Sequence, residues 1–219
     1  RHHVMNIVQS FLNRARSHPQ LSAISSHGKT LTYAELALRS HALAAGLLQN
    51  LSLKRAQRVM ICMENRAAFF ETLFACWIAG VCPVPVNAKL HPKEVRQIAQ
   101  DCQASALFCS SALFNGLQIA LSDMPSAPAL ISVDDGTFVD CFNFESLSIS
   151  EMHPNDIAWI FYTSGTTGVP KGAMLSHRNL LQMCLQYGAD IDCVQAGDTH
   201  LHVAPLSHGS GLYSLPHLF

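Results

Sequence analysis

The segment Tyr162–Gly172, YTSGTTGVPKG, carries the residues of this sequence that are best suited to hold a ligand. It follows an apolar stretch, Ile157–Phe161, but consists mainly of glycine, serine and threonine, which cannot build a core. Glycine permits backbone angles that let several N–H groups point at one anion, and hydroxyl groups add further donors. This chemistry suits a polyphosphate. The predicted phosphate-binding residues are Thr163, Ser164, Gly165, Thr166, Thr167, Gly168 and Lys171, the last of which supplies a positive charge.

This segment does not fit the P-loop pattern G-x-x-x-x-G-K-[ST]. Counted from Gly165, that pattern requires a second glycine at position 170 and a serine or threonine at position 172, where this sequence has Pro170 and Gly172. The hydroxyl that would hold magnesium after Lys171 is therefore missing. Because ATP binds together with Mg²⁺ and the segment has no carboxylate, we expect the protein ligand of the metal to lie elsewhere, and no metal-binding residue is assigned.

A second candidate site residue is His208, in the segment Ala204–Gly211, APLSHGSG. We expect it in a serine- and glycine-rich loop after a strand. A single histidine is a weak signal, so a substrate-site role and an ordinary buried or exposed position fit the sequence equally well. His200 and His202 alternate along the expected strand and would share one face, but no third ligand defines a metal site there.

Helix and strand patterns alternate around these residues and predict an α/β fold, with helices layered on a mostly parallel sheet. Thr32 and Glu35 form a capping-box pattern, Asn65 is expected to cap a helix that ends at Gly80, and residues 137–154 are expected to be irregular. The predicted helices are Asn6–Ser17, one after Thr32, one between Asn65 and Gly80, Pro92–Gln100, and His177–Tyr187, capped by Ser176 and stopped by Gly188. The predicted strands are Leu21–Ser25, Lys29–Thr32, Arg58–Met63, Val81–Asn87, Ser105–Ser110, Ala127–Val133, Asp156–Thr163 and Thr199–Pro205. The phosphate segment would then join a strand to a helix, where α/β sheets place ligands.

Composition narrows the function classes. The chain has 219 residues, 49% of them hydrophobic and 13% charged, which indicates a folded protein with a sizeable core. The net charge of −1 gives no reason to expect a nucleic acid or an anionic membrane as partner. The longest apolar stretch, residues 67–86, is interrupted by Glu71 and Gly80, so no transmembrane segment is expected.

Cysteine usage and the chain ends complete this picture. Eight cysteines lie mostly among apolar residues and form no C-x-x-C pair, which predicts a reducing, cytoplasmic setting with neither a disulfide framework nor a zinc site. Residues 1–4 resemble the end of an expression tag, and residues 5–219 are expected to form part of one domain. The apolar end of the sequence suggests a piece of a longer protein.

The segment Tyr162–Gly172 resembles the signature loop of the adenylate-forming superfamily, which includes acyl- and aryl-CoA synthetases, luciferases and the adenylation domains of peptide synthetases. Three further segments resemble other motifs of the superfamily and occur in the same order. Leu31–Leu36 (LTYAEL) resembles its first motif, Trp77–Asn87 (WIAGVCPVPVN) its second and Ala204–Gly211 (APLSHGSG) its fourth. Within the second, Cys82 and Pro83 replace the other small or aromatic residues that are more usual there. Helix capping and a helix stop account for the first two motifs structurally, so they support the resemblance more than any chemistry.

The resemblance implies an activity and its substrates. Family members adenylate a carboxylic acid with Mg²⁺ and ATP, release pyrophosphate and pass the acyl group to a thiol such as coenzyme A. Thr163–Gly168 would hold the β- and γ-phosphates, and Lys171 would lie near them, although a solvated or structural lysine fits nearly as well. His208, with Gly209 and Gly211, would lie at the acyl site and shape the path of the thiol.

The resemblance also implies what this chain lacks. Later family motifs supply an acidic residue for Mg²⁺, an aspartate for the ribose, a hinge, and a catalytic lysine on a mobile C-terminal domain. We therefore expect the first half of a large N-terminal domain with no catalytic residue, inactive by itself, from a parent acid–CoA ligase. An amino-acid adenylation domain is the first alternative, although the fourth motif has no aspartate for an amino group. A non-catalytic nucleotide-binding module is the second. The acid and the oligomeric state stay open.

Overall fold

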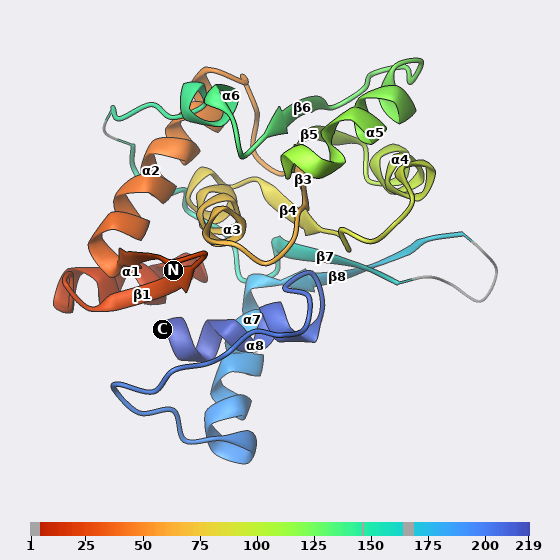
Figure 1. Ribbon diagram of the computed structural model, residues 1–219. Helices are drawn as coiled ribbons and strands as arrows, with labels where there is room; N and C mark the ends of the chain where they lie inside the picture. The colour runs from red at the N-terminus through yellow and green to blue at the C-terminus, as the bar shows by residue number, and fades with distance from the viewer. Residues whose placement is uncertain (1–4, 146, 164–168) are drawn as a thin grey trace.

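A four-stranded parallel sheet with the order β4-β3-β5-β6 organises the chain (Figure 1), as expected from the alternating pattern. This computed structural model describes residues 5–145, 147–163 and 169–219. The strands are β3 (Arg58–Cys62), β4 (Cys82–Pro85), β5 (Ala104–Cys109) and β6 (Ala129–Ser132). The helices that connect them are α3 (Ala67–Ala79), α4 (Pro92–Asp101) and α5 (Ser111–Leu121). The remaining helices are α1 (Val8–Ser17), α2 (Tyr33–Gln49), α6 (Gly136–Asp140), α7 (His177–Gln186), which continues into a π-helical turn η1 (Tyr187–Ile191), and α8 (Gly209–Leu218).

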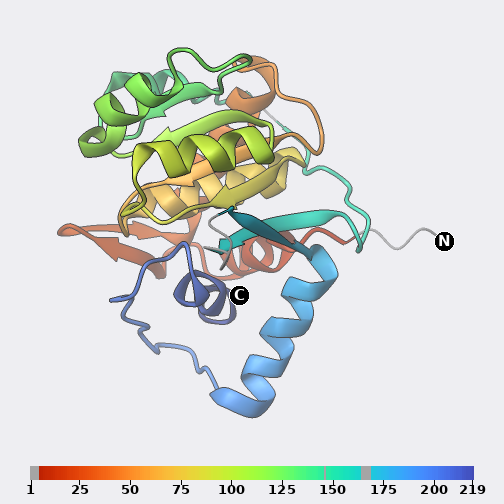
Figure 2. The same cartoon turned by 90° about the vertical axis from the view of Figure 1, so that its right-hand side faces the viewer.

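The sheet separates two hydrophobic cores because successive residues of a strand face opposite sides. Val59 and Ile61 of β3 pack with α1, α2 and α3, whereas Met60 and Cys62 pack with α4 and α5. Figure 2 shows the second layer, with α4 and α5 in front of the sheet and α7 and α8 extending below it. The result is the helix–sheet–helix layering predicted from the sequence.

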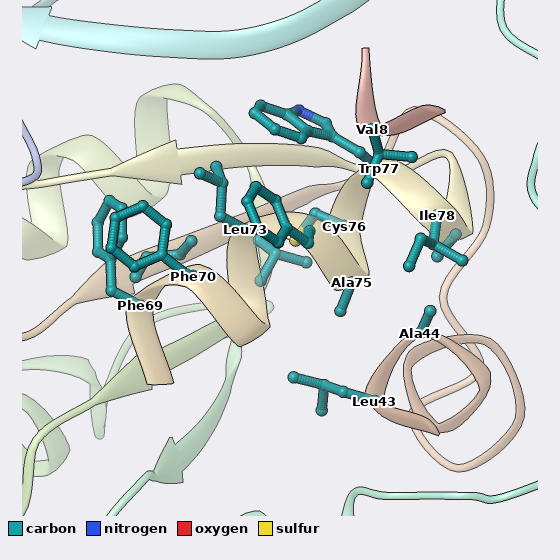
Figure 3. Packing of buried hydrophobic residues seen from close by; sticks show 14 of the residues in the cluster. Val8, Leu43, Ala44, Phe69, Phe70, Leu73, Ala75, Cys76, Trp77 and Ile78 are labelled. Atoms are coloured by element: carbon teal, nitrogen blue, oxygen red, sulfur yellow. The ribbon is translucent and has the colours of Figure 1, made fainter. Parts of the chain in front are cut away.

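Helix α3 lies at the centre of the larger core. Residues 69–79 are all buried, which requires apolar side chains around the whole helix. Figure 3 shows Phe70, Leu73 and Trp77 among the side chains of the neighbouring elements, with Leu43 and Ala44 of α2 nearby. Trp77 also donates a hydrogen bond of 2.7 Å from its indole N–H to the carbonyl of Ala158. As predicted, α3 ends at Gly80, which has the left-handed φ of 73° that glycine accommodates.

Two antiparallel hairpins form small sheets of their own beside the parallel sheet. The first pairs β1 (Ser22–Ser26) with β2 (Lys29–Thr32), and the second pairs β7 (Ile157–Thr163) with β8 (Lys171–Ser176). The predicted capping box is confirmed, because the Glu35 N–H donates to Thr32 Oγ1 (3.2 Å) and the Thr32 N–H donates to Glu35 Oε2 (2.8 Å). Ser176 caps α7 through the Asn179 N–H (3.1 Å), also as predicted.

Several sequence-based expectations are wrong. Residues 137–154 are not irregular throughout, because residues 136–140 form α6. The predicted strand Thr199–Pro205 has no strand conformation, since no described segment pairs with it. Asn65 does not cap α3; the residue at the N-cap is Arg66, and the Asn65 amide is engaged elsewhere. The phosphate segment does not lead directly into a helix, because β8 intervenes. Gly188 does not stop α7, because the chain continues through η1 to Ile191.

Helices α5, α6 and α8 were not predicted. All eight cysteines are free thiols, and six of them are buried. Within the described part of the chain, none of the helices is both long enough and apolar enough to cross a bilayer.

Candidate functional site

The candidate site is a cavity of about 360 Å³ beyond the carboxyl ends of β4 and β7. Its walls come from three elements that are distant in the sequence. The segment from β4 into α4 contributes Pro85, Val86, Asn87, Leu90, Glu94 and Ile98. The β7–β8 hairpin contributes Phe161, Tyr162, Thr163 and Pro170. The residues directly before α8 contribute Ser207 and His208. Apolar walls with a few polar groups are typical of small-molecule sites. The cavity thus brings two separately predicted segments, the phosphate segment and the fourth motif, to one place.

The β7–β8 hairpin positions the flanks of the predicted phosphate segment. Thr163, the last residue of β7, pairs with Lys171, the first residue of β8. The pairing holds both residues next to the segment between them. Lys171 is exposed. Ser164, Gly165, Thr166, Thr167 and Gly168 lie outside the described residues, and their role stays a prediction.

Tyr162 forms the wall between this cavity and its larger neighbour. The phenol donates a hydrogen bond to the Asp101 carboxylate at the end of α4. Burial, and then this hydrogen bond, raise the pKa of Tyr162 above its ordinary value, so the phenol stays protonated and keeps its donor. Gly172 leaves room for the ring, because a Cβ there would lie 3.0 Å from Tyr162 Cζ.

The neighbouring cavity is larger, about 600 Å³, but contains none of the predicted site residues. Its polar groups are already engaged with one another. Arg55 pairs with Asp156 at 2.6 Å, and the Arg58 guanidinium donates to the carbonyls of Ala56 (3.2 Å) and Cys102. Size alone therefore does not identify the site, and the smaller cavity is the better candidate.

His208 occupies the N-cap position of α8, not an open loop as expected. Its carbonyl accepts the Gly211 N–H (3.0 Å), and its ring lies 5.8 Å from the Phe161 ring, between centroids. The two predicted glycines differ. A Cβ at Gly211 would lie 1.8 Å from the Leu206 carbonyl oxygen, whereas a Cβ at Gly209 would meet nothing within 4 Å. Gly211 therefore has a packing role beside any role toward a ligand.

His200 and His202 lie close together, as expected, although not on a strand. Their ring centroids are 4.1 Å apart, and α8 adds His217, 4.2 Å from His200, which the sequence analysis missed. Burial, and then the neighbouring histidines, lower the pKa of His202 to about 4, so this ring is neutral at pH 7. Among the described residues, no group of three or more histidines, cysteines and acidic residues is arranged to hold a metal ion.

Asn65 is a second residue whose role the sequence analysis missed. Its side chain binds the backbone that leads to His208: the Leu206 N–H donates to Asn65 Oδ1 at 2.9 Å, and Asn65 Nδ2 donates to the Ala204 carbonyl, also at 2.9 Å. Ser207, the next residue, is 6% exposed, and its hydroxyl has no protein partner among the described residues. A buried hydroxyl that lines a cavity without a partner is available to a ligand.

The described residues do not fit a magnesium ion. Glu94 is the one carboxylate among the described residues that line the cavity. Its Oε2 already accepts the His91 N–H at 2.8 Å, in the capping box of α4. Mg²⁺ takes oxygen ligands in octahedral geometry, and a single engaged carboxylate is a poor basis for such a site. Where the protein ligand of the metal lies stays a prediction.

Comparison with known proteins adds independent information. A feruloyl-CoA synthase from Amycolatopsis sp is 34% identical to this chain over 209 residues, which cover 94% of the chain and 41% of that protein. A long-chain-fatty-acid–CoA ligase from Escherichia coli O157:H7 is 30% identical over 217 residues, which cover 84% of the chain and 39% of that protein. The chain therefore spans about two-fifths of the length of these curated relatives.

The fold is shared with solved structures. A long-chain-fatty-acid–CoA ligase from Archaeoglobus fulgidus superimposes with a TM-score of 0.87 at 21% sequence identity, covering 100% of this chain and 46% of that one. At this identity the likeness shows the fold alone. The model of the family described as AMP-binding enzyme matches residues 11–218, which is nearly the whole chain. The chain belongs to the AMP-binding enzyme family.

Proposed function

We propose that this chain is the front part of the large N-terminal domain of an acid–thiol ligase. The observation that supports this best is the shared cavity: Thr163 and Pro170, which flank the predicted phosphate segment, line it together with His208. A phosphate-binding group and an acyl-binding group must face one space if a carboxylate is to meet ATP there. The family membership and the names of the relatives point to the same class of reaction.

The proposed reaction has two steps. A carboxylate oxygen of the acid attacks the α-phosphorus of ATP, forming an acyl adenylate while pyrophosphate leaves. The thiol of coenzyme A then gives up its proton to water, its sulfur attacks the acyl carbon, a thioester forms, and AMP leaves with the bonding electrons. In the first step the segment from Thr163 to Gly168 and Lys171 would hold the departing phosphates, since hydrogen bonds to charged groups are the stronger ones. In the second step, His208 would border the space in which the acyl group and the thiol meet.

Two parts of the chemistry are assigned to no residue of this chain. Mg²⁺ would neutralise charge on the phosphates, but the described residues of the cavity do not fit it. The family resemblance implies that the catalytic lysine belongs to later motifs of the family. Because both act directly on the transition state, we propose that the 219-residue chain is inactive by itself. Acid-dependent ATP–pyrophosphate exchange by this chain would contradict that.

A second candidate is the adenylation of an amino acid for a carrier protein. An L-proline–[L-prolyl-carrier protein] ligase from Pseudomonas fluorescens is 30% identical to this chain over 198 residues. The fourth motif of this chain, PLSHGSG, lacks an acidic residue that could pair with an amino group, so we favour a carboxylate without one. A nucleotide-binding module without catalysis is the third candidate.

One assay series separates these candidates. The full-length protein is incubated with ATP and a panel of aliphatic acids, aromatic acids and amino acids, and isotope exchange between ATP and pyrophosphate is measured. Active acids are then tested for thioester formation with coenzyme A by mass spectrometry. The expected result is ATP–pyrophosphate exchange with a carboxylic acid that has no amino group, followed by formation of its CoA thioester. Exchange with amino acids alone would favour the second candidate, and ATP binding without any exchange the third. Elution volume and light scattering of the same sample give the oligomeric state.

A further inference from the structure

The side-chain amide of Asn65 joins two segments that lie about 140 residues apart. Asn65 Nδ2 donates to the carbonyls of His202 (3.2 Å) and Ala204 (2.9 Å), and Asn65 Oδ1 accepts the N–H of Leu206 (2.9 Å). An asparagine amide offers two donors and two acceptor sites, so three of its four hydrogen bonds go to this one stretch of backbone. These three hydrogen bonds, from the Asn65 side chain to the backbone of His202, Ala204 and Leu206, are called the clamp below.

The two ends of the amide are not interchangeable. Rotating the amide by half a turn would place its oxygen against two carbonyl oxygens and its NH₂ against an N–H group. The three bonded residues are His202, Ala204 and Leu206, and the chain bends at Ala204 between the other two. No described strand pairs with this stretch, so the Asn65 amide supplies hydrogen bonds that a strand does not.

Asn65 itself is firmly anchored. It lies between β3 and α3, both of which belong to the hydrophobic cores. The next residue, Arg66, pairs with Asp134 at 2.6 Å and with Glu64 at 3.0 Å. The clamp thus connects the centre of the fold to the segment that carries Ser207 and His208.

The clamp ends directly before the cavity wall. Leu206, which donates to Asn65, is buried at 3% exposure and is followed by Ser207 and His208, both of which line the cavity. Asn65 does not line the cavity. Any effect of this side chain on a ligand must therefore pass through the backbone of residues 202–206.

We propose that Asn65 is a positioning residue that sets the place of Ser207 and His208 at the cavity wall. This inference rests on the proposed ligase function. It predicts a selective effect, because the phosphate flanks Thr163 and Lys171 are held by the separate β7–β8 hairpin. Loss of the clamp should weaken the use of acid and thiol and leave the use of ATP nearly unchanged. A merely structural asparagine would lower stability and affect all substrates alike.

The test compares Asn65→Asp with Asn50→Asp in the full-length protein. Asn65→Asp is nearly isosteric but turns a carboxylate oxygen toward two carbonyls, which removes both donated hydrogen bonds. Asn50→Asp makes the same change at a position whose amide binds the Asp140 carbonyl instead (3.2 Å). For Asn65→Asp we expect the KM of the acid or of the thiol to rise about tenfold. The KM of ATP should stay within about twofold, and Asn50→Asp should resemble wild type.

A combined variant tests whether the effect passes through Ser207 and His208. In a background that carries both Ser207→Ala and His208→Ala, Asn65→Asp should raise the KM values much less than it does in wild type, because the groups it positions are gone. Full additivity of Asn65→Asp with this background would overturn the proposal. So would an equal rise of all three KM values.

Amide hydrogen exchange supplies a readout that needs no activity. In wild type the Leu206 N–H is protected by Asn65 Oδ1, an acceptor that Asn65→Asp would keep, so this experiment uses Asn65→Ala; the change should speed exchange at residues 206–208 and leave α2 unchanged. Unchanged exchange there would refute the clamp. If wild type activates no acid but exchange responds as expected, the proposed function fails while the clamp stands. If wild type is active but neither the exchange rates nor the KM values change in the variants, the proposal for Asn65 is wrong and the proposed function stands.

Discussion

The backbone N–H of Ile7 donates a hydrogen bond of 3.1 Å to Nδ1 of the buried His177 side chain, joining residues 170 positions apart in the chain. His177 begins α7 and is 1% exposed. An imidazole nitrogen that accepts a hydrogen bond cannot carry a proton, so this contact requires neutral His177. Burial holds the pKa of His177 at about 4, below its ordinary value of 6.5, although the nearby Asp156 charge opposes the shift.

The first prediction concerns pH. Below pH 6.5 the unfolded chain protonates His177 while the folded chain does not, so the free energy of unfolding falls until the pH reaches about 4. Above pH 6.5 both states are neutral and the contribution is constant. His177→Asn keeps an acceptor for the Ile7 N–H but cannot titrate. In denaturant unfolding, its loss of stability between pH 7.5 and pH 5 should be smaller than that of wild type by about 2 kcal/mol.

His202, whose pKa is also about 4, titrates in the same range and provides a comparison. Its contribution should remain in His177→Asn, so the variant keeps part of the pH dependence. Identical pH dependence of wild type and His177→Asn would show that His177 is protonated normally in the folded protein.

The second prediction concerns Gly46, in the interior of α2. Alanine normally stabilises a helix by about 1 kcal/mol relative to glycine. Here, however, a Cβ would lie 1.5 Å from the carbonyl oxygen of Cys141, which is rigid backbone. We expect Gly46→Ala to destabilise the protein by about 3 kcal/mol, measured by denaturant unfolding.

Gly188→Ala is the matched control for that experiment. It lies in the helical turn η1, and a Cβ there would meet nothing within 4 Å. This substitution should leave stability unchanged or raise it slightly. A stable Gly46→Ala variant would mean that α2 can move away from Cys141 at little cost.

Local signals accounted for most of the fold. Capping residues and hydrophobic periodicity located α2, α4 and α7, and buried apolar runs located β3 and β5. The caps of α2 and α7 are local, since Thr32 Oγ1 accepts the N–H of Glu35 and Ser176 Oγ accepts the N–H of Asn179, each within the first turn of its helix. The phosphate segment and the fourth motif were also identified from local sequence; Thr163 of the first and His208 of the second line one cavity, and their roles toward a ligand stay predictions.

Several of the missed features depend on contacts outside their own segment. Asn65 looked like a helix cap because asparagine at the start of an apolar helix is a common cap, but backbone far along the chain competes for its amide. Strand β8 is mainly exposed and has no alternating apolar pattern; it forms because β7 provides a ladder. His217 joins His200 only through the packing of α8. Sequence alone does not show such pairings.

The third prediction separates the two glycines of the fourth motif. Gly211→Ala would place a Cβ 1.8 Å from the Leu206 carbonyl oxygen, whereas the same change at Gly209 meets open space. We expect Gly211→Ala to lower stability by about 2–3 kcal/mol, and Gly209→Ala to change it by about 0.5 kcal/mol or less. Equal stability of the two variants would contradict the close packing of α8 on Leu206. A loss of substrate binding in Gly209→Ala at unchanged stability would instead assign that glycine to the ligand.

The last prediction concerns Lys171, which faces Thr163 across the β7–β8 hairpin and is exposed. If this ammonium contacts the phosphates of ATP, Lys171→Ala should raise the KM of ATP about tenfold in the full-length protein, since a hydrogen bond to a charged group contributes about 1.5–3 kcal/mol. Lys171→Arg keeps the charge and should recover part of this loss. Lys93→Ala, which removes an exposed lysine from the first turn of α4, is the control and should leave the KM of ATP unchanged. Pyrophosphate exchange measured over a range of ATP concentrations gives these values. An unchanged KM in Lys171→Ala would show a solvated lysine and would leave phosphate binding to backbone N–H groups and hydroxyls alone.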